Sequence, residues 1–514
     1  MPAQKSAATR TLIGVDVGST HIKAALVAPG SGPGTGVLHV ARRATDTHVV
    51  RGGGAYHRPA ELLAAVSSAI AECVAAAGAR KKPAAIGIAS MSESGVPIDR
   101  RNLPVGHILA WYDPRPERQA AWLERQIGAS ELFARTGLRP EPKYTLPKLL
   151  WLREQRAADF TRLRRWAGVA ELVALDLTGQ LATNASLACR TLAFDVTKRA
   201  WDPELLGLAS LVPDEMPVVL PLGQAAGGLT AAVAARLGLP SGTPVAIAGQ
   251  DHLAGALGAG VITPGDALDS MGSAEATLLV TKRPQLTEDV RRAGFSTGCH
   301  AVDGLAYVVG GLQSSGALVE WFLDTFMPPT TGEVDRYARF LELLEKAGPG
   351  PVEPIVRPYL RGRTAPHRDP SATLEFEGIR ETNGLVDLAA AVIDGAAYHV
   401  RWMLDELARI TVTPLDRVKL TGGGARNRRW MVAKAALGPG RLEVVRTEEA
   451  AALGAALVAG IACGAYESVA SAMVDASPFD RVTAPATIRA RYDAAYLDRW
   501  LPAVVTRLRQ SGPS

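Results

Sequence analysis

The sequence has little cysteine, few aromatic residues, little net charge and no long apolar run. Its four cysteines match no metal-site spacing, so we expect reduced thiols that pack inside a cytoplasmic protein. No apolar run is long enough to span a membrane, and Met1 to Thr11 lacks the apolar core of a signal peptide. The net charge of +5 comes from scattered Lys and Arg without a basic patch or aromatic platform, which argues against nucleic-acid binding.

The length and the pattern predict an α/β protein with two domains. A chain of 514 residues exceeds one ordinary core, and two domains of about 250 residues are the natural expectation. Two β-like runs, 12–17 and 22–27, flank a small-residue turn near the start of the chain. The same pattern returns at 266–271 and 276–281, so each half begins with strand, turn and strand.

The first turn places a carboxylate beside small hydroxyl residues. Asp16 ends the first strand and Gly18-Ser19-Thr20 follows it. The N–H groups and hydroxyls of such a turn can hold phosphate oxygens, while Asp16 holds Mg²⁺ directly or through water. Lys23 could add a positive charge for the same phosphates. The alternative is an exposed hairpin with an ordinary Asp near its turn.

Asp251 follows an apolar run, 245–248, and precedes a run of small residues, 253–259. The pattern predicts a buried strand that ends where a helix begins. Asp251 could be the N-cap, accepting hydrogen bonds from the first free N–H groups of that helix. It could also be a general base that takes a proton from a bound hydroxyl. The residues around Asp251 leave both roles open and by themselves favour the cap.

Two further segments carry side chains suited to a sugar. Glu93 follows the predicted strand 85–89 and could accept hydrogen bonds from two hydroxyls, although a solvated loop Glu looks the same in sequence. Trp111 offers a flat apolar face, with Asp113 and Arg115 as polar anchors. The alternative there is a core Trp followed by an Asp-Pro turn.

Glycines 422–424 join a predicted strand, 418–421, to a predicted helix, 428–437. Three glycines let a backbone approach a ligand closely, and a helix N-terminus favours phosphate. The spacing is not G-x-G-x-x-G and no acidic residue follows at the dinucleotide distance, which argues against a Rossmann site.

The motifs, taken together and in order, resemble the FGGY carbohydrate kinases, relatives of glycerol kinase and xylulose kinase in the actin-like ATPase superfamily. The resemblance runs from about Leu12 to about Ala465. It rests on IGVDVGSTHIKAAL (first phosphate motif), WYDPR (W-x-D-x-R), PKLLWL (P-K-L-x-W), AGQDHLAGALGAG (the catalytic Asp segment), DSMGSAEATL (second phosphate loop), EFEGIR with DLAAAVIDGAAY (second signature), LTGGGARN (adenosine segment) and EEAAALGAALVAG (the helix after it).

The resemblance implies two actin-like (ribonuclease H-like) ATPase domains with a cleft between them, an N-terminal domain over 1–255 on the substrate side and a C-terminal domain over 256–514 on the ATP side. It implies ATP-dependent transfer of phosphate to a primary hydroxyl of a ketose or polyol, with ATP and Mg²⁺ as cofactors and a homodimer as a common assembly. The implied site residues are Asp251 as base; Asp16 for Mg²⁺; Gly18, Ser19, Thr20, Lys23, Gly272 and Ser273 for phosphates; Gly316, Gly423, Gly424 and Asn427 for adenosine; and Glu93, Trp111, Asp113, Asp251 and His252 for the sugar.

Three departures from the family pattern leave the substrate open. The usual Glu-Arg pair of G-E-R-x-P is absent from residues 362–366, which read GRTAP, and Ser273-Ala274 replaces the usual Thr-Ser. Ser92 stands where glycerol kinases carry an Arg before the Glu. One alternative is a weak or inactive sugar- or nucleotide-binding regulator, which the retention of Asp16 and Asp251 disfavours. Another is an ATPase chaperone or filament protein, which the W-x-D-x-R segment disfavours.

Overall fold

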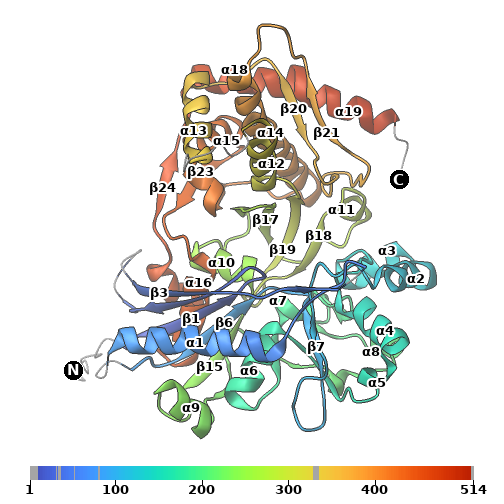
Figure 1. The fold of residues 1–514 in the computed structure, drawn as a ribbon, viewed down its shortest axis with the longest axis vertical. Coiled ribbons are helices and arrows are strands. Elements are labelled where there is room, and N and C mark those ends of the chain that lie inside the picture. The colour runs from blue at the N-terminus through green and yellow to red at the C-terminus, as the bar shows by residue number, and fades with distance from the viewer. Residues whose placement is uncertain are drawn as a thin grey trace.

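The computed structural model describes residues 10–30, 32, 36–50, 52–78, 82–327 and 335–510. Most of the segment Met1 to Thr11 therefore lies outside the described residues. The chain forms two lobes, each built on a mixed sheet, with helices α10 (Asp251–Gly258) and α16 (Ala450–Ala462) at their junction (Figure 1).

Among the described residues, six strands form the N-terminal sheet in the order β14-β15-β6-β1-β2-β3. Their bounds are β1 Leu12–Val17, β2 His21–Val27, β3 Val37–Ala44, β6 Ile86–Ser90, β14 Ala225–Gly228 and β15 Pro244–Gln250. The three central strands β15, β6 and β1 run parallel, and their apolar runs are buried. The hairpin expected at the start of the chain is confirmed, with Val17 paired to Ile22 across the turn.

Seven described strands form the C-terminal sheet, in the order β18-β19-β17-β16-β22-β23-β24. Their bounds are β16 Asp266–Met271, β17 Glu275–Thr281, β18 Ser296–Cys299, β19 Ala306–Leu312, β22 Arg417–Thr421, β23 Arg441–Val445 and β24 Phe479–Val482. Strands β16, β22 and β23 are parallel, and β16 pairs with β17 as the second expected hairpin. The sheet is thus a second version of the first, with parallel central strands and a hairpin at its start.

Smaller strands extend both lobes. A five-stranded sheet joins β4 His48–Val49, β5 Ala55–His57, β8 Ile108–Leu109, β7 Gly95–Ile98 and β9 Arg165–Gly168. Three strand pairs are β10 Ala182–Asn184 with β13 Val218–Leu220, β11 Phe194–Asp195 with β12 Ala200–Trp201, and β20 Ile355–Pro358 with β21 Leu374–Glu377.

Helices cover the sheets and fill the space around the small strands. In the N-terminal half they are α1 Pro59–Ala77, α2 Glu117–Ile127, α3 Ala129–Thr136, α4 Thr145–Gln155, α5 Ala157–Phe160, α6 Val169–Thr178, α7 Ala185–Ala188, α8 Pro203–Leu208 and α9 Ala231–Leu237. After α10 follow α11 Glu288–Arg292, α12 Gly316–Phe326, α13 Arg336–Ala347, α14 Leu385–Thr411, α15 Arg428–Leu437, α16, α17 Val469–Ala472, α18 Ala486–Ala495 and α19 Leu501–Gln510.

Helix α16 belongs to the C-terminal half by sequence but packs on the N-terminal sheet and on α10. Glycines make this close approach possible. A Cβ on Gly14 of β1 would lie 1.9 Å from the carbonyl oxygen of Ala452, and one on Gly87 of β6 would lie 1.9 Å from that of Ala455. Because α16 crosses between the lobes, the change of sheet between residues 250 and 266 does not separate two independently packed halves.

Helix α1 is long and apolar enough to cross a membrane by length and composition, contrary to the expectation that no such run exists. Its apolar side chains, however, belong to the core of the N-terminal sheet. Leu62, Val66 and Ile70 are almost fully buried there. Core helices of this kind satisfy the same length and composition test, so α1 packs as part of the lobe.

Candidate active site

Three carboxylates lie at or just beyond the ends of three adjacent parallel strands of the N-terminal sheet: Asp16 near the end of β1, Glu93 after β6 and Asp251 after β15. Ser90 at the end of β6 pairs with Val17 of β1 on one side and with Gln250 of β15 on the other. Since the carboxyl ends of parallel strands meet at one edge, Asp16, Glu93 and Asp251 reach the same edge of the sheet. Ligands of open α/β sheets bind at such an edge.

Asp251 is the first residue of α10, and Gln250 occupies the N-cap position. The interpretation of Asp251 as the N-cap is therefore wrong: among the described residues, its side chain accepts one hydrogen bond, from the neighbouring N–H of His252 to Oδ1 at 2.7 Å. The side chain is 27% exposed. Burial in the site raises the pKa of its carboxyl and the Glu93 carboxylate adds to the rise, while His252 and Arg190 oppose it. A raised pKa suits a general base.

The carboxyl group of Asp16 is not fully hydrogen-bonded. Its Oδ1 is buried and has no hydrogen-bond partner among the described residues. Burial, together with the carboxylates of Asp251 and Glu449, raises the pKa of Asp16 to about 7 against the opposing charge of Lys23. A divalent cation would relieve this crowding of negative charge, so the site fits Mg²⁺. In the described chain no group of three His, Cys, Asp or Glu side chains is placed to hold a metal ion by itself, so water and phosphate oxygens would complete the coordination.

Thr45 forms hydrogen bonds to the first phosphate turn, Gly18-Ser19-Thr20. Thr45 donates its N–H to the carbonyl of Thr20 at 2.9 Å and its hydroxyl to that of Gly18 at 2.8 Å. In the described part of the chain, the N–H groups of Ser19 and Thr20 have no acceptor. Lys23 forms an ion pair of 2.9 Å with Glu449, at the start of α16. The turn therefore offers free donors, while its lysine is anchored to a residue from the other half of the chain.

The second phosphate turn rests on the start of α12. The N–H groups of Ser315, Gly316 and Ala317 donate to the carbonyls of Gly272 and Ser273 at 3.0 to 3.1 Å. A Cβ on Gly316 would lie 2.7 Å from the oxygen of Gly272. Gly316, predicted near adenosine, thus packs directly under the turn, and these N-terminal N–H groups of α12 are already used.

A buried ionic cluster lies beneath this second turn. The ammonium of Lys434 on α15 meets the carboxylates of Asp269 on β16 and Glu275 on β17. Glu275 also accepts a hydrogen bond of 2.5 Å from the hydroxyl of Ser315. Burial and the neighbouring Glu275 raise the pKa of Asp269 to about 8. The cluster joins the strands of the hairpin to α15 and to the start of α12.

The glycine-rich segment lies beside the second turn. Strand β22 runs parallel to β16 with Thr421 opposite Ser270, so both strands end at the same edge. Gly422 has φ 92°, and a Cβ there would lie 2.5 Å from the carbonyl oxygen of Met271. Asn427 is buried and caps α15 by accepting the N–H of Trp430 at 3.1 Å. The residues predicted for adenosine, Gly423, Gly424 and Asn427, are therefore next to the second phosphate turn.

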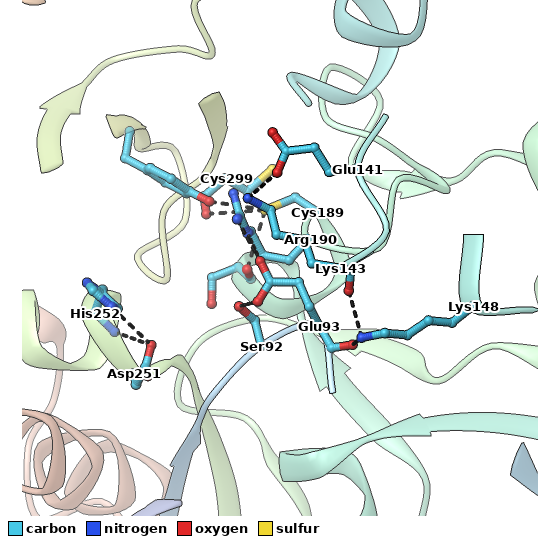
Figure 2. A network of polar contacts seen from close by, with 12 residues as sticks. Ser92, Glu93, Glu141, Lys143, Lys148, Cys189, Arg190, Asp251, His252 and Cys299 are labelled. Atoms are coloured by element: carbon cyan, nitrogen blue, oxygen red, sulfur yellow. Dashed lines mark hydrogen bonds and ion pairs between the residues drawn. The ribbon is translucent and has the colours of Figure 1, made fainter. Parts of the chain in front are cut away.

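Glu93 pairs with an arginine that the sequence did not point to. Arg190 donates from Nε at 2.8 Å and from Nη2 at 2.6 Å to Oε1 of Glu93, and the Ser92 hydroxyl donates to Oε2 (Figure 2). Burial works against ionisation of Glu93, yet Arg190 and Lys143 hold its pKa below the usual range. Arg190, 97 residues away, thus supplies the charge that Ser92 lacks.

The other predicted sugar residues lie in different environments. Trp111 is 38% exposed and packs edge-on against Tyr112. Asp113 is buried, and both of its oxygens accept hydrogen bonds from the guanidinium of Arg115 at 2.5 to 3.0 Å. A sugar hydroxyl would have to share these oxygens with Arg115. The ring of His252 is partly exposed, with Nε2 at 3.9 Å from Asp251 Oδ1.

Comparison with known proteins gives a consistent result over nearly the whole chain. Residues 11–258 match the N-terminal domain, and residues 267–463 the C-terminal domain, of the FGGY family of carbohydrate kinases. The chain is 24% identical to gluconokinase of Bacillus subtilis over 466 residues, which cover 90% of this chain and 89% of that protein. It is 26% identical to xylulose kinase of Staphylococcus xylosus over 366 residues, 71% of this chain and 74% of that one. The crystal structure of xylulose kinase from Rhodospirillum rubrum superimposes with a TM-score of 0.87 at 26% identity, covering 98% of this chain and 99% of the other.

Proposed function

The chain belongs to the FGGY family of carbohydrate kinases, and from this premise we propose that it transfers the γ-phosphoryl group of ATP to a primary hydroxyl of a small ketose or polyol, with Asp251 as the general base. As a member of the family it is a phosphotransferase with an alcohol group as acceptor. The observation that carries the proposal is the position of the Asp251 carboxyl at the sheet edge that Asp16 and Glu93 also reach, where burial raises its pKa. The expected homodimer and cytoplasmic location stay predictions.

One carboxylate oxygen of Asp251 is available to the hydroxyl of the acceptor sugar. Its Oδ1 accepts the N–H of His252, which fixes the carboxylate and leaves Oδ2 to receive the proton of the sugar hydroxyl. Phosphoryl transfer asks the protein mainly for positioning and charge neutralisation. The base therefore contributes through a fixed position next to the hydroxyl.

The two turns and Asp16 would serve the nucleotide. The free N–H groups of Ser19 and Thr20, with Gly18 and Lys23, would face the phosphates from the N-terminal lobe, and Gly272 and Ser273 would do so from the other lobe. Asp16 would hold Mg²⁺ through the oxygen that has no partner. When bound, the cation neutralises charge on the β- and γ-phosphate oxygens.

The acceptor would lie against the Glu93 side of the site. Glu93, Trp111, Asp113 and His252 are the proposed sugar contacts, and Arg190 keeps the Glu93 carboxylate ionised and oriented. The relatives carry the names gluconokinase and xylulose kinase, which supports an open-chain or keto sugar as acceptor. Release of ADP should therefore be stimulated by at least one of D-xylulose, D-gluconate and glycerol. ATP binding without any sugar-stimulated turnover would instead support an inactive regulator.

The role of the base is tested by Asp251→Asn. The substitution should lower kcat by a factor of about 10² to 10⁴ and leave ATP affinity nearly unchanged, because the amide keeps the shape but accepts no proton. Asp480→Asn on the surface of β24 is the matched control and should keep its kcat. A kcat of Asp251→Asn close to that of the wild type would remove Asp251 from the role of base.

A further inference from the structure

Lys148 is a fully buried lysine in the first turns of α4. Its neighbours along the helix, Leu146, Leu149 and Leu150, are buried as well. Because side chains of a helix lean toward its N-terminus, the Lys148 side chain reaches back over the start of α4. There Nζ donates to the carbonyl of Glu93 at 2.6 Å and to that of Lys143 at 2.7 Å (Figure 2).

The surroundings of the Lys148 Nζ suit the neutral amine better than the charged ammonium. Its acceptors are two neutral carbonyl oxygens, and two is the number of N–H donors on an uncharged amine. Burial lowers the pKa of Lys148 to about 7, although the carboxylates of Glu93 and Asp113 favour the charged form. Asp113 is already paired with Arg115, and Lys143 adds a repelling positive charge. Lys148 therefore works as a hydrogen-bond donor between two backbone segments.

One of these segments is under backbone strain. Glu93 has φ 64°, and the N–H of Ser94 donates to the carbonyl of Ser92 at 2.8 Å, which defines a tight γ-turn centred on Glu93. A side chain rarely adopts this conformation unless its surroundings hold it there. Arg190 and Ser92 hold the Glu93 carboxylate, and Lys148 holds the Glu93 carbonyl.

We infer that Lys148 is a positioning residue for the sugar, acting through the Glu93 turn that it ties to the start of α4. The inference rests on the proposed function, in which Glu93 contacts the acceptor. Without Nζ, the turn would relax from its left-handed conformation, and the carboxylate would leave the position in which Arg190 holds it. ATP, which the proposal places on the other turns, would be unaffected.

Steady-state kinetics of Lys148→Met tests this role. Methionine keeps the length of the side chain and removes the N–H donors. With whichever of D-xylulose, D-gluconate and glycerol gives the highest turnover, we expect the KM for the sugar to rise about tenfold and the KM for ATP to change less than about twofold. Lys148→Gln keeps N–H donors on a shorter side chain and should raise the sugar KM less than Met does.

The matched control is Leu149→Ala, which weakens the packing of the same helix and leaves the two hydrogen bonds of Lys148 in place. This variant should lose thermal stability and keep the sugar KM of the wild type. If Leu149→Ala raised the sugar KM as much as Lys148→Met, the effect would belong to helix packing and the inference would be overturned.

Hydrogen exchange measured by mass spectrometry tests, without any substrate, whether Lys148 holds the turn at Glu93. Amides of residues 92–95 should exchange at least about fivefold faster in Lys148→Met than in the wild type or in Leu149→Ala. If none of the three acceptors is phosphorylated by the wild type, the proposed function fails, yet the exchange result still decides whether Lys148 holds the turn. Unchanged exchange over 92–95 in Lys148→Met would overturn the inference.

Discussion

In each lobe a buried lysine lies beneath a turn of the candidate site, Lys148 in one and Lys434 in the other, and the two are held in opposite ways. Lys148 in the N-terminal lobe meets two carbonyl oxygens, whereas Lys434 in the C-terminal lobe meets the carboxylates of Asp269 and Glu275. Burial lowers the pKa of Lys148 to about 7. Burial also acts against the charge of Lys434, but there the two carboxylates prevail and its pKa is raised.

The difference shows two solutions to the cost of burying a cation. A lysine without a counter-ion approaches neutrality, while a lysine with carboxylates keeps its charge and neutralises theirs. Both lysines serve a turn: Lys148 through the Glu93 carbonyl, and Lys434 through Glu275, which also accepts the Ser315 hydroxyl under the second phosphate turn. The same residue type thus supports both turns, but removing it should have very different costs.

Replacing Lys434 should have the largest effect on stability. Lys434→Met leaves two buried carboxylates without a cation, and breaking such a buried pair costs about 3–5 kcal/mol. Urea denaturation followed by circular dichroism measures the loss. The triple variant that adds Asp269→Asn and Glu275→Gln should recover most of it, because no unpaired charge remains. A loss below about 1 kcal/mol for Lys434→Met would show that the cluster is not ionic and would remove the contrast with Lys148.

Replacing Lys148 should cost less. Lys148→Met leaves two partly buried carbonyls without donors but creates no unpaired charge, so we expect a loss of about 1–3 kcal/mol in the same denaturation experiment. Leu149→Met, a change of similar volume on the same helix, should cost less than about 1.5 kcal/mol. A loss for Lys148→Met as large as that for Lys434→Met would mean that Lys148 carries a paired charge and that the two lysines are equivalent.

Local patterns in the sequence were sufficient for the backbone of the site. The two hairpins, the strand before Asp251 and the glycine segment at 422–424 were predicted because apolar runs and small-residue turns are short-range signals. The parallel order of β1, β6 and β15, which brings Asp16, Glu93 and Asp251 to one edge, was not predictable from those runs alone. The family resemblance implied the cleft and its residues, but not this strand order.

The sequence did not predict which side chains form hydrogen bonds and ion pairs with the site residues. Glu93 meets Arg190, 97 residues away, and Lys148, 55 residues away, and nothing in the local sequence of either marks the contact. Glu449 reaches Lys23 because α16 packs across onto the other sheet. The interpretation of Asp251 as N-cap failed for a local reason, because helix α10 starts at Asp251 itself, one residue earlier than an Asp cap requires.

The pH dependence of stability should report the lowered pKa of Lys148, with the smallest effect of the set. Near pH 7 the native state begins to release the proton of Lys148, while the unfolded chain keeps it to about pH 10.5, so unfolding takes up a proton. Raising the pH from 7 to 8 should therefore stabilise the wild type relative to Lys148→Met by about 1 kcal/mol. Denaturation midpoints of the wild type and of Lys148→Met across pH 5 to 8.5 measure this trend. Parallel curves for the wild type and Lys148→Met above pH 7 would show that Lys148 keeps its charge when buried, like Lys434.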